Sequence, residues 1–137
     1  MKVDRLNTIN NNDPYSGIEF KLTTSEIRNP DGTVVFSQKN IEVPVSWSQV
    51  AADVLAQKYF RKAGIAKKLK KVAEDWVPEF LWRSIPDDKE LSTLNNEERF
   101  IGEQSCKEVF NRIAGAWAYW GWKGGYFDSE EDDKAYF

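Results

Sequence analysis

The stretch from Ser105 to Phe127, SCKEVFNRIAGAWAYWGWKGGYF, constrains the fold more than any other part of the sequence. Its apolar residues recur at the spacing of one helical face, which predicts an amphipathic α-helix with a buried stripe. The predicted stripe comprises Val109, Phe110, Ile113, Ala116, Trp117 and Trp120. Ser105 and Glu108 have the spacing of a capping box at the start of this helix. The helix is expected to end at three glycines: Gly121, Gly124 and Gly125.

The end of this stretch, WGWKGGYF, alternates large aromatic residues with glycines. Glycine permits close approach of the backbone, and aromatic rings supply contact area. Two interpretations follow: a helix end covered by its own aromatic residues, or a contact surface for another domain. The aromatic share of the whole chain is 14%, with six tryptophans, so either a core or a partner must cover much apolar surface.

Several kinds of function are excluded by what the sequence lacks. The chain has no histidine and one cysteine, Cys106, so no histidine-based catalytic group and no zinc or dithiol site is predicted. We therefore predict no catalytic, cofactor-binding or metal-binding residue. The net charge of −3 argues against a nucleic-acid partner. No apolar run is long enough to span a membrane, the first residues do not resemble a secretory signal, and a lone cysteine is typical of the cytoplasm.

The first part of the chain predicts a polar arm followed by a small β-hairpin. Met1 to Phe20 is polar and asparagine-rich, and we expect it to be flexible. Asn29 to Gly32 predicts a turn, and Pro44 is expected to end the hairpin. The segments predicted to be extended are Ile18 to Leu22, Thr33 to Phe36 and Ile41 to Val43.

Helical periodicity predicts the remaining elements. Ser46 to Ala63 reads as a helix with a buried stripe, capped by Ser46 and Gln49. The expected stripe comprises Trp47, Val50, Ala51, Val54, Leu55 and Tyr59. Ala66 to Val77 is predicted to be a second helix with a basic face of four lysines. Further helical segments are expected at Pro78 to Arg83, where Phe80 and Trp82 enter the core, at Lys89 to Leu94, and after a cap at Asp128, where the end of the chain interrupts the last helix.

Two stretches carry a resemblance to a known family. They are DGTVVFSQKNIEVPVSWSQVAADVLAQKYFRKAGI and VFNRIAGAWAYWGWKGGYFDSEEDDKAYF. Both resemble the N-terminal region of the adenosylcobalamin-dependent (class II, vitamin B12-dependent) ribonucleotide reductases. The similarity runs from about Asn29 to the end of the chain, and runs such as LAQKYFRKAG and YWGWKGGYF are long enough to be specific.

The resemblance implies a part of an adenosylcobalamin-dependent ribonucleoside-diphosphate reductase, which converts ribonucleotides to deoxyribonucleotides by radical chemistry. In that family the radical-site cysteines, the cobalamin-binding surface and the substrate phosphate loop belong to a ten-stranded α/β barrel and a C-terminal tail. Neither segment is covered here, so adenosylcobalamin and the ribonucleotide are expected to bind elsewhere in the full enzyme. Cys106 therefore receives no catalytic role.

These observations predict a mainly α fold: a small helical domain with a short N-terminal β-hairpin, normally packed on a barrel that this sequence lacks. We divide the chain into an arm with short strands (1–45), a helical N-terminal reductase domain (46–127) and the start of a helix (128–137). The domain is expected to be structural, inactive alone and cytoplasmic. Its candidate contact residues are Trp120, Trp122, Lys123, Gly124, Gly125 and Tyr126. The barrel would be its partner in cis, or in trans if the chain is a separate small subunit, and an aromatic-rich module for sugar or single-stranded nucleic acid is a third, less favoured reading.

Overall fold

The computed structural model describes all residues from 1 to 137, and the chain divides into two compact units. The first unit comprises Met1–Ser16, Ala66–Phe100 and Phe110–Phe137, and the second comprises Gly17–Ile65 and Ile101–Val109. A small domain with an N-terminal β-hairpin and four α-helices matches the predicted fold class. No helix is long and apolar enough to cross a membrane.

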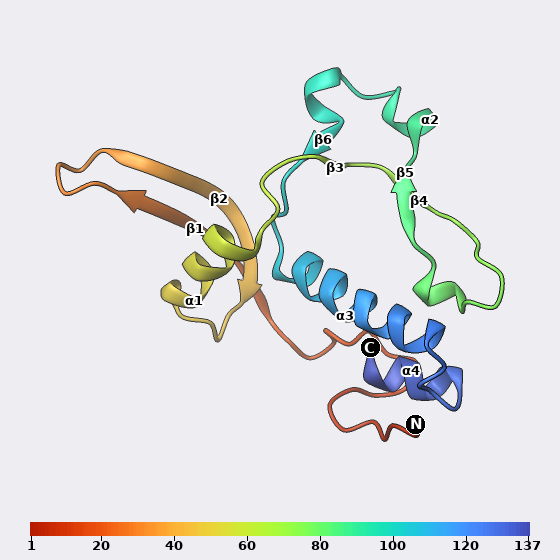
Figure 1. Cartoon of the computed structure of the whole chain (residues 1–137). Coiled ribbons are helices and arrows are strands. Elements are labelled where there is room, and N and C mark those ends of the chain that lie inside the picture. Colours follow the sequence, from red (N-terminus) through yellow and green to blue (C-terminus); the bar gives the residue numbers. More distant parts are fainter. The chain divides into compact units, whose positions relative to one another are not determined.

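The second unit is built on the predicted hairpin, whose strands are longer than expected. Strands β1 (Phe20–Arg28) and β2 (Val34–Pro44) pair antiparallel, and Figure 1 shows them as a long ribbon with helix α1 alongside. The turn forms as predicted: the Gly32 N–H donates to the Asn29 carbonyl at 2.9 Å, and Gly32 has φ +87°, which glycine adopts without strain. Ile41 and Val43 are fully buried in the core of this unit.

The single helix expected over Ser46 to Ala63 is wrong in its length and its cap. Helix α1 covers Gln49–Val54 and continues as a π-helix, η1 (Leu55–Tyr59). Ser48, not Ser46, caps it, because the Ser48 hydroxyl accepts from the Ala51 N–H. Helical geometry stops at Phe60, whose ψ is 130°, because the next residues pair with Glu103 instead. A long-range contact has overridden local helix propensity.

The face that α1 and η1 bury is rotated from the predicted stripe. The buried residues are Ala52, Leu55, Ala56 and Phe60, whereas Val50, Val54 and Tyr59 are exposed. Hydrogen bonds from glutamine side chains orient the helix on the hairpin. The Gln49 amide donates to the Thr24 carbonyl at 2.9 Å, and the Gln57 amide donates to the buried Ser25 hydroxyl at 3.2 Å.

In the first unit, the helix predicted for Ala66 to Val77 is wrong. This segment is extended: β4 (Leu69–Lys71) pairs antiparallel with β5 (Ser84–Pro86), with Lys70 opposite Ile85. The Val72 N–H prolongs the ladder by donating to the Arg83 carbonyl at 3.0 Å. Two-residue strands β3 (Ile65–Ala66) and β6 (Phe100–Ile101) also pair with each other. Inter-strand pairing, which the helical periodicity does not report, decides the backbone here.

Short helical elements follow. The predicted turn after Pro78 is a 3-10 helix, η2 (Glu79–Leu81), with Pro78 at the N-cap. Helix α2 (Asp88–Leu91) is capped by Asp87 and precedes the 3-10 helix η3 (Asn96–Glu98). The core of this unit forms around Val77, Leu81 and Ala118, and Phe80 and Trp82 pack against it as predicted.

Helix α3 (Cys106–Lys123) begins at the predicted capping box. The Ser105 N–H donates to the Glu108 carboxylate at 2.8 Å, and the Ser105 hydroxyl accepts from the Lys107 N–H at 3.2 Å. The helix does not stop at Gly121 but runs through it to Lys123. Gly121 is needed for packing instead, because the ring of Phe127 occupies the space that a side chain at 121 would need.

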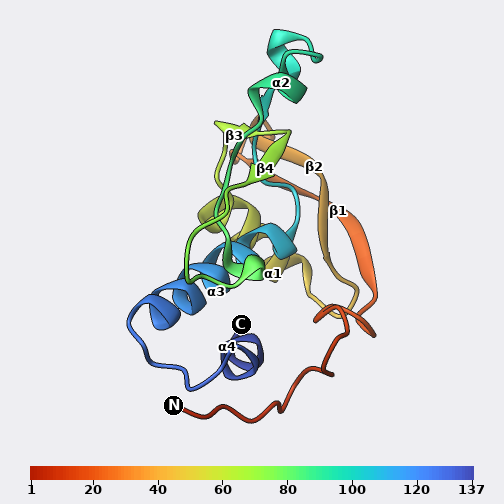
Figure 2. The same cartoon turned by 90° about the vertical axis from the view of Figure 1, so that its right-hand side faces the viewer.

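Helix α4 (Glu130–Tyr136) is capped by Ser129 rather than by Asp128, which pairs with the amino group of Met1 at 2.5 Å. Figure 2 shows α4 beside α3, with the N-terminal arm running past it. The arm was predicted to be flexible, but it is bonded to α4: the Val3 N–H donates to the Asp132 carboxylate at 2.8 Å. The ring of Phe137 lies against Gly115 of α3, so small residues on α3 allow this approach.

Candidate functional site

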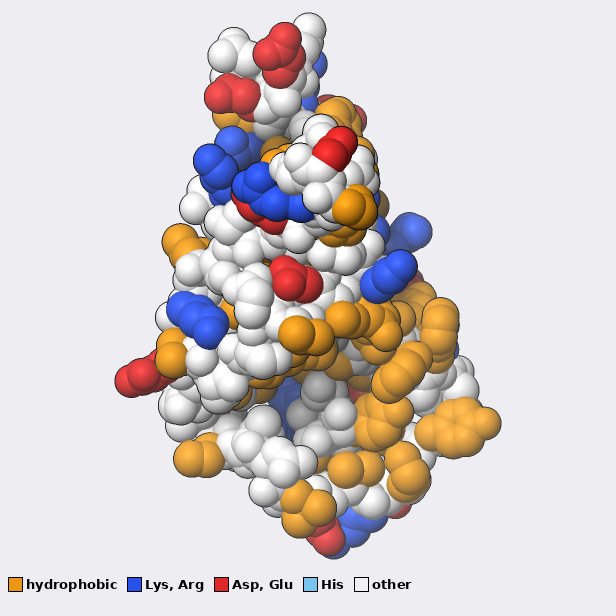
Figure 3. All heavy atoms as spheres, turned by 90° about the vertical axis from the view of Figure 1, so that its left-hand side faces the viewer, with side chains coloured by type: hydrophobic (Ala, Val, Ile, Leu, Met, Phe, Trp, Pro, Cys, Tyr) orange, Lys and Arg blue, Asp and Glu red, His pale blue; other side chains and the backbone are white.

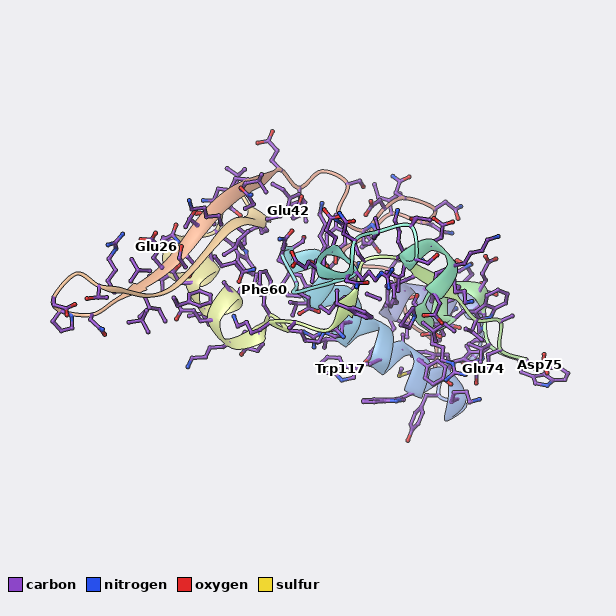
Figure 4. All side chains as sticks on the ribbon, turned by 90° about the horizontal axis from the view of Figure 1, so that it is seen from above. Glu26, Glu42, Phe60, Glu74, Asp75 and Trp117 are labelled. Carbon is purple, nitrogen blue, oxygen red and sulfur yellow. The ribbon has the colours of Figure 1, made fainter.

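The C-terminal half of α3 holds a loop of residues 74–77 in place. The Tyr119 hydroxyl donates to both carboxylate oxygens of Glu74 at 2.9 Å, and the Lys123 ammonium donates to one of them at 2.7 Å. These bonds, that from Lys123 first, lower the pKa of the Glu74 carboxyl. Figure 4 shows Glu74 beside α3. The loop is therefore tied to the helix by a charge-assisted contact.

Two tryptophan indoles hold the backbone of the same loop. Trp122 Nε1 donates to the Trp76 carbonyl at 2.6 Å, and Trp82 Nε1 donates to the Val77 carbonyl at 2.9 Å. Trp76 itself has φ +66°, in the left-handed region, and its side chain is 94% exposed. A loop with the exposed Trp76 at its tip is thus held by four side chains: Tyr119, Trp122 and Lys123 of α3, and Trp82. This loop is called the Trp76 loop below.

The predicted buried stripe of α3 is largely wrong, because much of it faces outward. Of its six residues only Val109 is buried, whereas Phe110, Trp117 (56% exposed) and Trp120 (64% exposed) are exposed. Figure 4 shows Trp117 away from the body of the helix, and Figure 3 shows hydrophobic side chains (orange) reaching the surface of the face that it displays. The buried residue of the C-terminal half is Ala118, whose small side chain admits the close packing that a tryptophan would prevent.

The six candidate contact residues take different places. Trp120 and Tyr126 (66% exposed) offer aromatic surface, whereas Trp122 and Lys123 hold the Trp76 loop. The two remaining residues are glycines of the turn after α3. Gly124 lies under the ring of Tyr126, and Gly125 has φ +68°, which suits glycine. Sequence reasoning missed Trp76 because it lies in the segment predicted to be a helix, Ala66 to Val77, which is not helical in the structure.

The second unit contains a hollow of about 470 Å³ lined by residues of β2, of the 61–62 segment and of 102–104. Its most buried group is Glu103, fully excluded from solvent, which accepts from the Arg61 N–H at 2.8 Å and from the Arg61 Nε at 2.9 Å. Gly102 permits this approach, since a Cβ there would lie 2.6 Å from the Lys62 carbonyl oxygen. The Glu103–Arg61 pair fixes the backbone on one side of the hollow.

Cys106 is the one thiol of the chain, and no cluster of metal ligands surrounds it. No group of three histidine, cysteine, aspartate or glutamate residues could hold a metal ion. Cys106 is 1% exposed, and burial raises the pKa of its thiol, which makes it a poor nucleophile despite its place at the start of α3. The residues present therefore do not fit a cobalt ligand set or a radical site.

Comparison with known proteins decides the family. Residues 21–137 match the family model described as class II vitamin B12-dependent ribonucleotide reductase. The chain belongs to this family. The vitamin B12-dependent ribonucleotide reductase of Bradyrhizobium diazoefficiens is 61% identical over 137 residues, which are 100% of this chain and 11% of the relative. That of Agrobacterium fabrum is 55% identical over 136 residues, again 11% of the relative.

A third relative, the vitamin B12-dependent ribonucleotide reductase of Rhodopirellula baltica, is 38% identical over 47 residues, or 34% of this chain. The chain thus corresponds to the N-terminal part of this class II reductase family and spans about a ninth of the length of the Bradyrhizobium and Agrobacterium relatives. The predicted membership of the family is confirmed. Relatives that depend on vitamin B12 support a cobalamin for the full-length reductase.

Proposed function

We propose that this chain is the structural, non-catalytic N-terminal domain of a class II ribonucleotide reductase and packs onto the catalytic barrel of the same polypeptide. The observation that carries the proposal is the outward apolar face of α3, where Phe110, Trp117 and Trp120 are exposed on a helix whose opposite side is already packed. Exposed apolar surface of this kind is typical of an interface. The chain itself is inactive, and the full reductase acts in the cytoplasm.

The contact surface is proposed to comprise the residues at the end of α3 and in the turn after it: Trp120, Trp122, Lys123, Gly124, Gly125 and Tyr126. Trp120 and Tyr126 would supply the area, because tryptophan and tyrosine are enriched at the centre of interfaces. Trp122, Lys123 and the two glycines would act by shaping the surface. Adenosylcobalamin and the ribonucleotide would bind in the barrel, which this domain positions.

The test uses the longer reductase chain that carries these residues. Trp120→Asp should lower its ribonucleotide reduction and its melting temperature, because a charge would be forced into the interface. In the 137-residue chain alone the same change should leave the melting temperature within about 1 °C, since Trp120 is exposed there. Leu6→Asp, at an exposed residue of the N-terminal arm, is the matched control. A Trp120→Asp reductase as active and stable as its parent would refute the proposal.

The isolated chain provides a second test. Incubated with cobalamin cofactor and reductant, it should not reduce any ribonucleotide, and turnover would contradict a purely structural role. Addition of the chain to a separately produced barrel distinguishes docking in trans. Restored activity would favour the small-subunit alternative over a domain that acts only in cis.

A further inference from the structure

Trp76 stands apart from every other exposed residue of the chain. Its exposure of 94% is higher than that of any other exposed large hydrophobic side chain. Its φ of +66° is shared among non-glycine residues only with Asn11 and Asn40, and asparagine tolerates this region, whereas a bulky residue does not. Trp76 therefore combines an unfavourable backbone conformation with an uncovered apolar ring.

The surrounding structure enforces this arrangement. Glu74 is bonded to Tyr119 and Lys123, the Trp76 carbonyl accepts from Trp122, and the Val77 carbonyl accepts from Trp82. Val77 is buried in the core of the first unit. Strained residues persist only where their surroundings over-determine them, and they cluster at functional sites. The bonds fix the loop on both sides of Trp76 and leave the ring without a partner within the unit.

We infer that Trp76 is an anchor residue that inserts its indole into an apolar pocket of the reductase polypeptide beyond residue 137. This inference rests on the proposed docking function and extends it to a residue outside the proposed contact set. The same α3 end that carries Trp120 also supplies Trp122 and Lys123 to the loop, so hydrogen bonds join the loop to the proposed surface. The curated relatives are about nine times longer than this chain, so most of their length is available to provide the pocket.

A pre-set loop lowers the entropy that docking must overcome, because the anchor is already held in its bound conformation. Tryptophan is also one of the residues enriched at interface hot spots, which cluster in well-packed central pockets. Both points favour insertion into a fixed pocket of the folded chain over transient contact with a small ligand.

The decisive experiment is photo-crosslinking in the longer reductase chain. The photoreactive residue p-benzoylphenylalanine replaces Trp76 in one sample and Trp120 in another, and mass spectrometry identifies the linked peptides. Mixing isotope-labelled with unlabelled chains separates links within one polypeptide from links between copies. The expected result is a link from position 76 to a peptide beyond residue 137 of the same polypeptide.

The two positions distinguish the two proposals. A link from position 120 beyond residue 137, with none from 76, would overturn the anchor and leave the docking function intact. No such link from either position would overturn both. A link from 76 to a second copy, or only to residues 1–137, would also overturn the inference.

Substitution gives an independent readout that does not depend on the photoreactive group. In the longer reductase, Trp76→Ala should speed tryptic cleavage after Lys123 by about thirtyfold, the change expected when a hot-spot contact is lost and opening limits cleavage. Asp75→Ala, in the same loop, should change the rate less than about twofold. In the 137-residue chain, where Lys123 is already half-exposed, both variants should be cleaved at the parent rate. Equal rates for all three longer reductases would overturn the anchor.

Discussion

Each of the two compact units excludes one carboxylate from solvent, and the two are treated in opposite ways. In the second unit, Glu103 is fully buried and is bonded twice by Arg61. In the first unit, Asp133 is equally buried, yet neither of its carboxylate oxygens has a hydrogen-bond partner. Burial, with a smaller effect of Glu130, raises the pKa of Asp133 to about 6.

The second unit thus pairs its fully buried carboxylate, whereas the first leaves Asp133 unpaired, although its other buried carboxylate, Asp132, accepts from the Val3 N–H. The first unit also carries the strained Trp76 loop and the outward aromatic face of α3. Unsatisfied buried groups, strained backbone and exposed apolar surface are each expected where a structure is completed by a partner. The three features gather in one unit, which is therefore the unit expected to dock.

The largest expected effect comes from breaking the satisfied carboxylate. Glu103→Ala should lower the free energy of unfolding of the chain by about 3 kcal/mol, because the Arg61 N–H and guanidinium lose their buried acceptor. The measurement is urea unfolding followed by circular dichroism. Glu26→Ala, which removes an exposed pair with Arg28, should cost less than about 0.5 kcal/mol. Equal losses in the two variants would show that burial of Glu103 adds nothing.

Replacement of the unsatisfied carboxylate, that of Asp133, should instead raise the stability of the chain. Asp133 has a pKa of about 6 in the folded chain against 3.8 as its ordinary value, so the folded state binds more protons between these values. Stability contributed by its protonated form is complete below about pH 3.8 and is lost as pH rises through 6. Asp133→Asn should therefore stabilise the chain, and its advantage over the parent should be about 2 kcal/mol greater at pH 7 than at pH 4.5.

Unfolding of both proteins at the two pH values gives this difference directly, and lowered carboxyl pKa values elsewhere, such as that of Glu74, cancel between them. Asp75→Asn removes an exposed carboxylate of the same unit and should show no pH-dependent advantage. If Asp133→Asn is no more stable than its parent at pH 7, then the carboxylate of Asp133 is satisfied in solution, and the contrast between the two units fails.

Local sequence signals predicted the parts of the fold whose bonds are local. The Ser105–Glu108 capping box and the Asn29–Gly32 turn each join residues three apart, and both form as expected. The helix predicted for Ala66–Val77 failed because β4 pairs with β5, a contact that no helical periodicity reports. α3 was recognised, but the side that it buries was not. The small Ala118 faces the core and the large aromatic Trp117 faces outward, which is the opposite of what side-chain hydrophobicity predicts.

The candidate site shows the same division. Trp120 and Tyr126 were singled out because aromatic residues and glycines lie close together in the sequence, and both side chains are exposed. Trp76 was overlooked because its segment was predicted to be helical, whereas in the structure its carbonyl accepts from Trp122, a residue 46 positions away. Helical patterning identifies which residues share a face. It does not identify which of two apolar faces a partner will cover.

The smallest expected effect separates strain from burial in the Trp76 loop. Trp76→Asn keeps the Trp122 bond, because that bond involves the backbone carbonyl, and asparagine accepts the left-handed conformation at lower cost than tryptophan. The isolated 137-residue chain should gain about 0.5–1 kcal/mol, since the lost ring is exposed and buries little area. Thermal unfolding measures the gain. Asn40→Gly is the control at another left-handed position, where the gain should be only a few tenths of a kcal/mol because asparagine already tolerates this conformation.

In the longer reductase Trp76→Asn should lower stability instead, because the indole would then be the group that docks. A variant that gains stability in both proteins would show that Trp76 is strained without being an anchor, and only the aromatic face of α3 would remain as the docking surface.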